Sequence, residues 1–187
     1  MGNEKKILES ILKRVSTSAI LPNTTNSVDY VNHFLVKYQV DLQNAKVIPL
    51  HISCQVASSL ELWKSIAMCI QEGTNSFFDP NDLKLQVLNR KYATIQNYTE
   101  IENIRTDIVW ILPKLKEVLQ KDILLIFSDF DNAISIMNEF DSMKWRSLTG
   151  CAVILTFSSK TLIELGEKKY NNSYFCNQFE DPIFINP

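Results

Sequence analysis

The chain has 187 residues, of which 45% are hydrophobic and 21% are charged, and its formal net charge is −2. This length and composition fit one globular domain with its own core, and the charge excludes a general basic surface for nucleic acid. Because the first residues are polar and no apolar run reaches the roughly 18 residues of a membrane span, we expect a cytoplasmic protein without a membrane segment.

Hydrophobic periodicity predicts an alternation of helices and strands. Helices are indicated where apolar residues recur every three or four positions, and strands where short apolar runs are unbroken. In chain order we expect a helix over 4–15, a strand over 18–21, a helix over 28–38, a strand over 46–53, a helix capped by Ser58 or Ser59, a short helix from 79 to about 90, helical sequence over 100–121, a strand over 122–127, a helix over 133–138, a strand over 151–157, a helix over 161–169 and a strand over 182–185. This order predicts an α/β fold of three layers, in which helices cover a mostly parallel five-stranded sheet.

Two prolines qualify this pattern. Pro49 lies inside the strand expected over 46–53, and because proline offers no N–H to a neighbour, we expect an edge strand or an irregular one. Pro113 interrupts the helical sequence over 100–121, so we expect either a kink or the start of a second helix there.

The cysteines and histidines form no pattern typical of a metal or catalytic site. His33 and His51 have no evident acid or nucleophile partner in the sequence, so we interpret each as a surface or satisfied core residue. We expect no metal site. The cysteines contain no CxxC pair and are expected to be reduced, mostly buried thiols: Cys54, Cys69, Cys151 and Cys176.

The most informative stretch is the acidic end of the strand expected over 122–127. Its apolar residues are continuous, which predicts a central strand buried on both faces, and Asp129 and Asp131 follow it closely. Ligands bind at the carboxyl ends of such strands, so both carboxylates are candidate catalytic residues. The alternative interpretation is that Asp129 and Asp131 cap the helix expected next, because carboxylates satisfy the free N–H groups of a helix N-terminus.

The order of elements and several local segments resemble the P-loop ATPase core of the AAA+ and STAND type, especially the AAA-like ATPases. Ser128-Asp129-Phe130-Asp131 stands where that family has its Walker B ending, and Thr156 and Ser158 stand where it has a sensor segment. The resemblance covers nearly the whole chain. It implies a single degenerate AAA-like ATPase domain over residues 1–187, without the lid or winged-helix domain that usually follows.

The departures from this family fall where its chemistry occurs. The phosphate loop G-x-x-x-x-G-K-[ST] uses glycines for close backbone approach, lysine for the phosphates and a hydroxyl for Mg²⁺, but this chain has no glycine between residues 3 and 72. In the matching alignment Asn26 replaces the second glycine, Ser27 the lysine and Val28 the hydroxyl residue, while Ser128 and Asp129 replace the Walker B aspartate and the catalytic glutamate. The degenerate loop positions are Asn23, Thr24, Thr25, Asn26 and Ser27.

These departures predict a catalytically inactive pseudo-ATPase that acts as a protein-interaction or regulatory module. We expect no cofactor, and a protein partner that is either an active ATPase paralogue or a second copy of the chain; membrane and nucleic-acid partners are not expected. One alternative is a residual ATP-binding protein or slow ATPase that uses ATP and Mg²⁺. A lesser alternative is a haloacid-dehalogenase-like phosphatase, in which Asp129 is the nucleophile and Asp131 the general acid/base.

Overall fold

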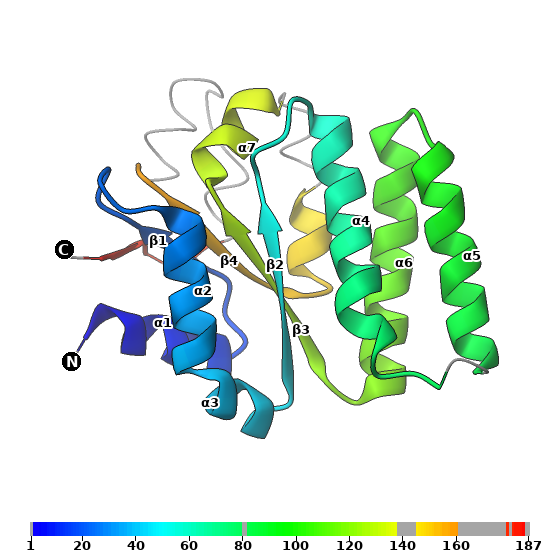
Figure 1. The fold of residues 1–187 in the computed structure, drawn as a ribbon, viewed down its shortest axis with the longest axis horizontal. Helices are drawn as coiled ribbons and strands as arrows, with labels where there is room; N and C mark the ends of the chain where they lie inside the picture. Colours follow the sequence, from blue (N-terminus) through cyan, green and yellow to red (C-terminus); the bar gives the residue numbers. More distant parts are fainter. Residues whose placement is uncertain (1, 80–81, 138–144, 161–178, 180, 186–187) are drawn as a thin grey trace.

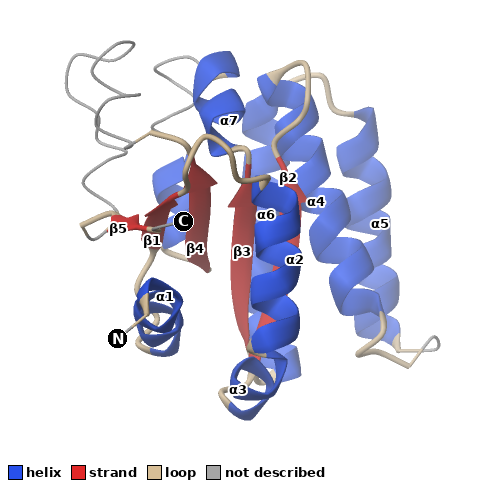
Figure 2. Cartoon of the chain, turned by 60° about the vertical axis from the view of Figure 1, so that its left-hand side comes forward, coloured by secondary structure: helices blue, strands red, loops and turns tan. Residues whose placement is uncertain are grey.

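The computed structural model describes residues 2–79, 82–137, 145–160, 179 and 181–185. Five parallel strands form one sheet in the order β2-β3-β4-β1-β5, and helices cover both of its faces (Figures 1 and 2). The expected three-layer α/β architecture is therefore confirmed. The strands are β1 (Thr17–Ile20), β2 (Val47–Ser53), β3 (Asp122–Ser128), β4 (Val153–Ser158) and β5 (Ile183–Phe184).

The helices form one layer on each face of the sheet. One layer contains α1, α2 and α3, whose apolar residues share a core with one face of the strands. The other layer contains α4 to α7 and shares a second core with the opposite face. The helices are α1 (Asn3–Leu12), α2 (Ser27–Lys37), α3 (Gln39–Asn44), α4 (Ser59–Asn75), α5 (Leu83–Asn97), α6 (Ile101–Leu119) and α7 (Phe130–Ile136).

Strand β3 lies inside the sheet, between β2 and β4, and is buried on both faces, as its unbroken apolar sequence predicts. Leu124 and Ile126 belong to the core under α1 and α2, whereas Leu125 and Phe127 belong to the core under α4 and α6. Successive side chains of a strand point to opposite faces, so one strand joins both cores. The acidic sequence after β3 therefore follows a strand that both cores hold in place.

Several helix boundaries differ from the expected ones. The expected helix from 79 to about 90 is wrong at both ends, because α5 begins at Leu83 and continues to Asn97. Asp82 determines the start, since its side chain accepts a hydrogen bond from the Lys84 N–H at 2.8 Å. Helix α7 begins at Phe130 rather than near 133, and the short α3 was not expected. The helix expected over 161–169 lies outside the described residues.

Helix α6 is one continuous helix despite Pro113, so the prediction of a second helix starting there is wrong. A proline inside a helix leaves the carbonyl four residues earlier without its N–H partner. For Pro113 this is the carbonyl of Val109. The thiol of Cys151 donates to that carbonyl at 3.8 Å. The Cys151 thiol, which is a weak donor located just before β4, thus compensates in part for the missing hydrogen bond.

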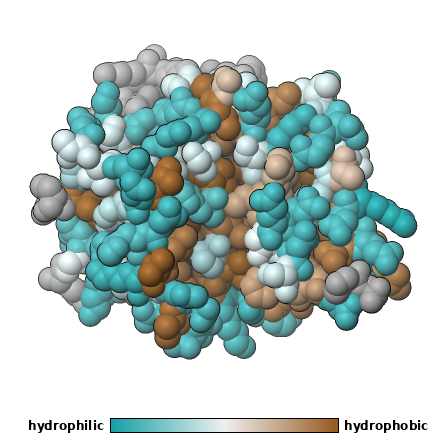
Figure 3. Space-filling view, in the orientation of Figure 1, coloured by the Kyte–Doolittle hydropathy of each residue, from teal (hydrophilic) through white to brown (hydrophobic). Residues whose placement is uncertain are grey.

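Strand β2 is an edge strand of the described sheet, which confirms the expectation drawn from Pro49. The Cys69 thiol of α4 donates to the His51 carbonyl at 3.3 Å. Helix α4 also approaches β2 closely, because a Cβ added to Gly73 would lie 2.2 Å from a methyl carbon of Leu50. Hydrophobic atoms lie between α2 and α4 on the face shown in Figure 3.

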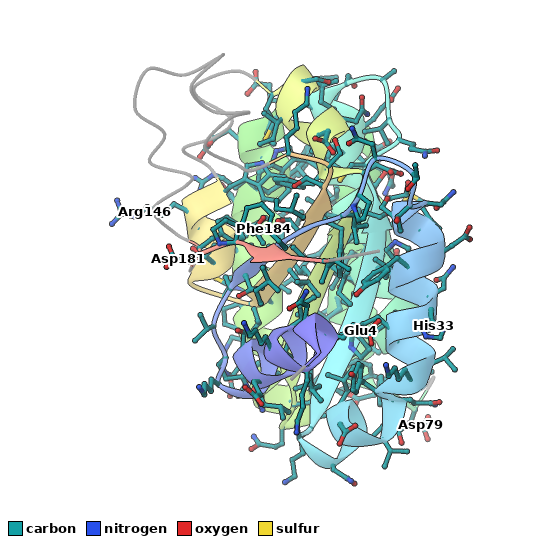
Figure 4. The ribbon with its side chains drawn as sticks, turned by 90° about the vertical axis from the view of Figure 1, so that its left-hand side faces the viewer. Glu4, His33, Asp79, Arg146, Asp181 and Phe184 are labelled. Atoms are coloured by element: carbon teal, nitrogen blue, oxygen red, sulfur yellow. The ribbon has the colours of Figure 1, made fainter. Side chains whose placement is uncertain are left out.

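The remaining residues singled out in the sequence have ordinary environments. His33 is exposed on the outer side of α2 (Figure 4). Cys54, Cys69 and Cys151 are free thiols, and burial raises the pKa of Cys69 to about 11. Cys176 lies outside the described residues. Among the helices that the structure describes, none combines the length and the hydropathy required to cross a membrane.

Candidate functional site

The candidate site lies where the carboxyl ends of β1 and β3 meet the N-terminus of α2. After β1 the chain passes through residues 21–26 before α2 begins at Ser27, and Asp129 directly follows β3. Strand β4 lies between β1 and β3 in the sheet. The carboxyl ends of parallel strands share one edge, so Ser27 and Asp129, which are 102 positions apart in the sequence, come into contact there.

Asp129 makes three hydrogen bonds with two residues from other elements. The Ser27 hydroxyl donates to its Oδ1 atom, and the Gln55 side-chain amide donates to its Oδ2 atom at 2.8 Å. The Asp129 N–H donates back to the Ser27 hydroxyl at 3.0 Å. We call Ser27, Gln55 and Asp129 the Asp129 network. Both carboxylate oxygens of Asp129 have neutral donors from the chain itself.

Asn26 occupies the N-terminus of α2. Its side-chain Oδ1 accepts hydrogen bonds from the N–H groups of Val28 at 2.9 Å and Asp29 at 3.1 Å. The preceding loop closes as a turn, in which the Thr25 N–H donates to the Pro22 carbonyl at 2.9 Å. The first N–H groups of a helix are the groups that bind phosphate when they are free. Here the chain's own amide oxygen already takes two of them.

The interpretation of Asp129 and Asp131 as helix caps is wrong for their side chains. Asp129 occupies the N-cap position of α7 in the left-handed region, with φ 52°, but its carboxylate makes no capping hydrogen bond. Asp131 accepts from the Ser159 N–H at 2.7 Å and from the Ser159 hydroxyl at 3.1 Å. Asp131 therefore ties the first turn of α7 to the end of β4, while Asp129 contacts α2.

The sensor-like residues Thr156 and Ser158 are almost completely buried, with 0% and 2% of their surface exposed. The Ser158 hydroxyl donates to the Lys160 carbonyl at 2.7 Å. Within the described residues the Thr156 hydroxyl has no hydrogen-bond partner. In this conformation neither hydroxyl is available to a ligand in solvent.

His51 has a partner that sequence reasoning missed. Its Nε2 atom lies 2.9 Å from the Ser128 hydroxyl, on the neighbouring strand β3. Burial lowers the pKa of His51, and the nearby Asp129 carboxylate opposes this shift. A serine beside a histidine is the arrangement of a nucleophile and its base, but Ser128 has no exposed surface. No substrate reaches the hydroxyl in this conformation, so the pair links β2 and β3.

The charge of the site comes from carboxylates. Asp129, Asp131 and Asp29 lie at or beside it, whereas no lysine or arginine side chain takes part in the hydrogen bonds described above. Across the described part of the chain, no three His, Cys, Asp or Glu side chains are grouped as a metal site requires. A polyphosphate approaching the Asp129 network would therefore meet the negative charge of these carboxylates.

Comparison with known proteins identifies the fold. No protein-family model matches the chain, and no curated protein matches its sequence. Among solved structures, the ORC2 protein of Aeropyrum pernix, with ADPNP and ADP, superposes with a TM-score of 0.62 at 10% identity over 98% of this chain and 45% of that one. A Walker-type ATPase of Pyrococcus abyssi gives a TM-score of 0.59 at 15% identity over 99% of this chain and 52% of that one. The fold is P-loop ATPase-like.

The ORC1 protein of Aeropyrum pernix, solved in complex with DNA, supports the same P-loop ATPase-like fold. Its TM-score is 0.61 at 11% identity, over 99% of this chain and 44% of that one. The present chain therefore spans about half the length of these proteins. At such low identities the likeness establishes the P-loop ATPase-like fold alone.

Proposed function

We propose that this chain is a pseudo-ATPase: a P-loop ATPase-like domain that does not bind or hydrolyse ATP in the usual way and acts through contacts with another protein. The observation that carries the proposal is the capping of α2 by Asn26, whose Oδ1 accepts from the N–H groups of Val28 and Asp29. In P-loop enzymes backbone N–H groups at this place cradle phosphates. To bind a phosphate in the same way, this chain would first have to release its own cap.

The Asp129 network refines the alignment with the phosphate loop. The P-loop hydroxyl and the Walker B aspartate both hold Mg²⁺, so the two side chains must lie together. The contact between Ser27 and Asp129 favours Ser27 as the counterpart of the hydroxyl residue and Asp129 as that of the Walker B aspartate. In this register, one residue earlier than the sequence alone suggests, Thr25 replaces the second glycine and Asn26 replaces the lysine.

Both registers lack the glycine and the lysine. The backbone at Thr25 carries a side chain where close phosphate approach needs none, and Asn26 supplies no positive charge. The magnesium half of a nucleotide site is thus represented by Ser27 and Asp129, whereas the phosphate half is absent. This division supports a decayed site more than a working one.

The direct test is calorimetric titration of the purified chain with Mg·ATP and with Mg·ADP. We expect no binding heat and no shift in melting temperature at about 1 mM nucleotide, which corresponds to less than roughly 4 kcal/mol of binding free energy. Binding in the micromolar range would refute the pseudo-ATPase. It would mean that the nucleotide displaces the Asn26 cap.

A gain-of-function variant tests the physical reason. Thr25→Gly with Asn26→Lys restores the missing glycine and lysine in the register that the Ser27–Asp129 contact favours, and we expect it to bind Mg·ATP more tightly than the wild type. The matched control, Asn26→Gly with Ser27→Lys, carries the same residue types one position later and removes the hydroxyl. If the control binds as well as the first variant, the register is wrong.

Residual ATP binding remains the second candidate function, because the Ser27–Asp129 pair is itself the kind of hydroxyl and carboxylate pair that holds Mg²⁺. This candidate predicts weak nucleotide binding that requires Mg²⁺ and is lost in Asp129→Asn. Weak binding that is independent of both Mg²⁺ and Asp129 would exclude it.

A further inference from the structure

The outer face of helices α5 and α6 carries an exposed apolar groove. Its lining includes Val87 and Leu88 from α5 and Trp110 and Val118 from α6, and its volume is about 250 Å³. Trp110 is 42% exposed and Val87 is 49% exposed, while Leu83, one turn before Val87, is 74% exposed. We call this the α5–α6 groove. Figure 1 shows α5 as the outermost helix of its layer, beside α6.

The two helices that form the groove are joined by polar contacts. Lys91 of α5 forms an ion pair with the buried Asp107 of α6 at 2.6 Å, and the Tyr98 hydroxyl donates to the same carboxylate at 3.1 Å. The Lys91 ammonium also lies 5.5 Å from the centre of the Trp110 ring. The groove is therefore preformed, so a ligand does not need to order it on binding.

The charged residues that line the groove are two lysines and one carboxylate: Lys84, Lys114 and Glu117. Helix α5 contains Lys84, Arg90 and Lys91 and no carboxylate. Lys91 is paired with Asp107, whereas Lys84 and Arg90 make no ion pair with any residue that the structure describes. On α6, Lys114 and Glu117 also border the groove and pair with each other at 3.0 Å, but both are more than half exposed. Such a pair is screened and exchanges partners at little cost.

We propose that the α5–α6 groove binds an acidic amphipathic helix of a protein partner; this inference rests on the proposed role as an interaction module. An apolar ridge would place side chains between Val87 and Trp110, and carboxylates beside the ridge would meet Lys84 and Lys114, which line the groove. The volume suits one or two anchoring side chains and lies below the roughly 300–1,000 Å³ of small-molecule sites. Helices commonly dock in grooves through such periodic anchors.

The charge also distinguishes this occupant from a second copy of the chain. The two lysines of the lining, Lys84 and Lys114, outnumber its one carboxylate, Glu117, so two copies that met through this groove would bring together two surfaces of net positive charge. Like charges brought together oppose binding. An acidic helix has the complementary charge and is therefore the occupant to which we commit.

A pair of synthetic helical peptides tests the proposal. The first is a peptide of about 18 residues with leucine at helical spacing and glutamate at the other positions, and the second has lysine in place of every glutamate. Binding is measured from the fluorescence anisotropy of the labelled peptide and from the tryptophan emission of the chain, to which the exposed Trp110 contributes. We expect the acidic peptide to bind at least about 10-fold more tightly than the basic one, with an affinity that falls as salt is raised.

The variants use two exposed valines on different surfaces. Val87→Glu places a carboxylate in the groove and is expected to weaken binding of the acidic peptide about 10-fold or more, as is Lys84→Glu. Val36→Glu is the matched control, because Val36 is 77% exposed on α2, and it should leave the affinity unchanged. Equal binding of both peptides, or equal effects of the two valine variants, overturns the proposal.

Two further arms name the other occupants. If a DNA duplex or vesicles containing phosphatidylserine change the tryptophan emission where the acidic peptide does not, the proposal is overturned in favour of those ligands. Concentration-dependent dimerisation that is lost in Val87→Glu would overturn it in favour of a second copy. The nucleotide titration is separate. A failed peptide test with no ATP binding refutes the groove alone, whereas ATP binding with normal peptide binding refutes the pseudo-ATPase alone.

Discussion

The Asp129 network and the α5–α6 groove differ in how far their chemical groups are already satisfied. In the network, the carboxylate oxygens of Asp129 accept hydrogen bonds from Ser27 and Gln55, and Asn26 caps the adjacent N-terminus of α2. In the groove, Val87 and Trp110 keep much of their surface in water, and Lys84 has no carboxylate partner among the described residues.

This difference teaches where a ligand can gain binding energy. A group that already has a hydrogen bond must lose it before it can bind something else, so the net gain is small. Exposed apolar surface and unpaired cations gain from contact without such an exchange. The place in the fold where ligands usually bind is thus the less available of the two in this chain.

The largest effect is expected on the free energy of unfolding, when two adjacent residues of α5, Val87 and Leu88, are each replaced by alanine. Leu88 is 5% exposed and belongs to the core, so Leu88→Ala should lower the free energy of unfolding by about 2–5 kcal/mol through the cavity it leaves. Val87→Ala, on the outer face, should lower it by less than about 1 kcal/mol. Urea denaturation of both variants measures the contrast. Equal losses would show that the outer face of α5 supports the fold and is not free for a partner.

A smaller effect on the free energy of unfolding is expected when the carboxylates of Asp129 and Glu117 are each replaced by an amide. Asp129→Asn keeps a residue that tolerates the left-handed backbone but turns an amide N–H₂ toward donors, so we expect a loss of about 1–3 kcal/mol in unfolding free energy. Glu117→Gln, at the exposed pair with Lys114, should change it by less than about 0.5 kcal/mol. Functional residues often reduce stability. An Asp129→Asn variant that is more stable than the wild type would therefore indicate a working ligand site at the Asp129 network. It would contradict the view that the groups of the network are satisfied within the chain.

The smallest effect is a pH dependence that involves His51. Burial lowers its pKa below the usual 6.5, so the unfolded chain binds the proton first as the pH falls. Stability is therefore lost progressively below about pH 6.5, down to the lowered folded-state pKa. The difference in unfolding free energy between pH 7.5 and pH 5.5 should be smaller in His51→Gln than in the wild type. The exposed His33 provides the control, since His33→Gln should keep the full pH dependence.

Much of the fold was predictable because its signals are local. The unbroken apolar run of β3 predicts a strand buried on both faces, and Pro49 predicts the edge position of β2. The order of such elements then restricts the sheet to a few arrangements. Ser58, one of two expected caps, does cap α4, where its hydroxyl accepts from the Glu61 N–H.

The contacts of the site were not predictable in the same way. Ser27 and Asp129 are 102 positions apart, and His51 and Ser128 are 77 apart, so no periodicity in the sequence relates them. Asp129 and Asp131 looked like helix caps because that role depends only on neighbours in the chain. In the structure both carboxylates bond to residues of other elements: Asp129 to Ser27 at the start of α2 and Asp131 to Ser159 after β4. The strand order brings these elements together, and it cannot be predicted from neighbours in the chain.

The exposed edge of β2 has a consequence for aggregation. A sheet of parallel apolar strands offers an incoming strand a row of unpaired N–H and C=O groups, and proteins that leave such a row open are prone to polymerise. Pro49 removes one donor from this row, and the Cys69 thiol already donates to the carbonyl of His51. The absent Cβ of Gly73 lets α4 lie close enough to supply that thiol. A larger residue at position 73 would press on the Leu50 side chain and so disturb the contact between α4 and this edge, although position 73 lies in a helix and not in the sheet.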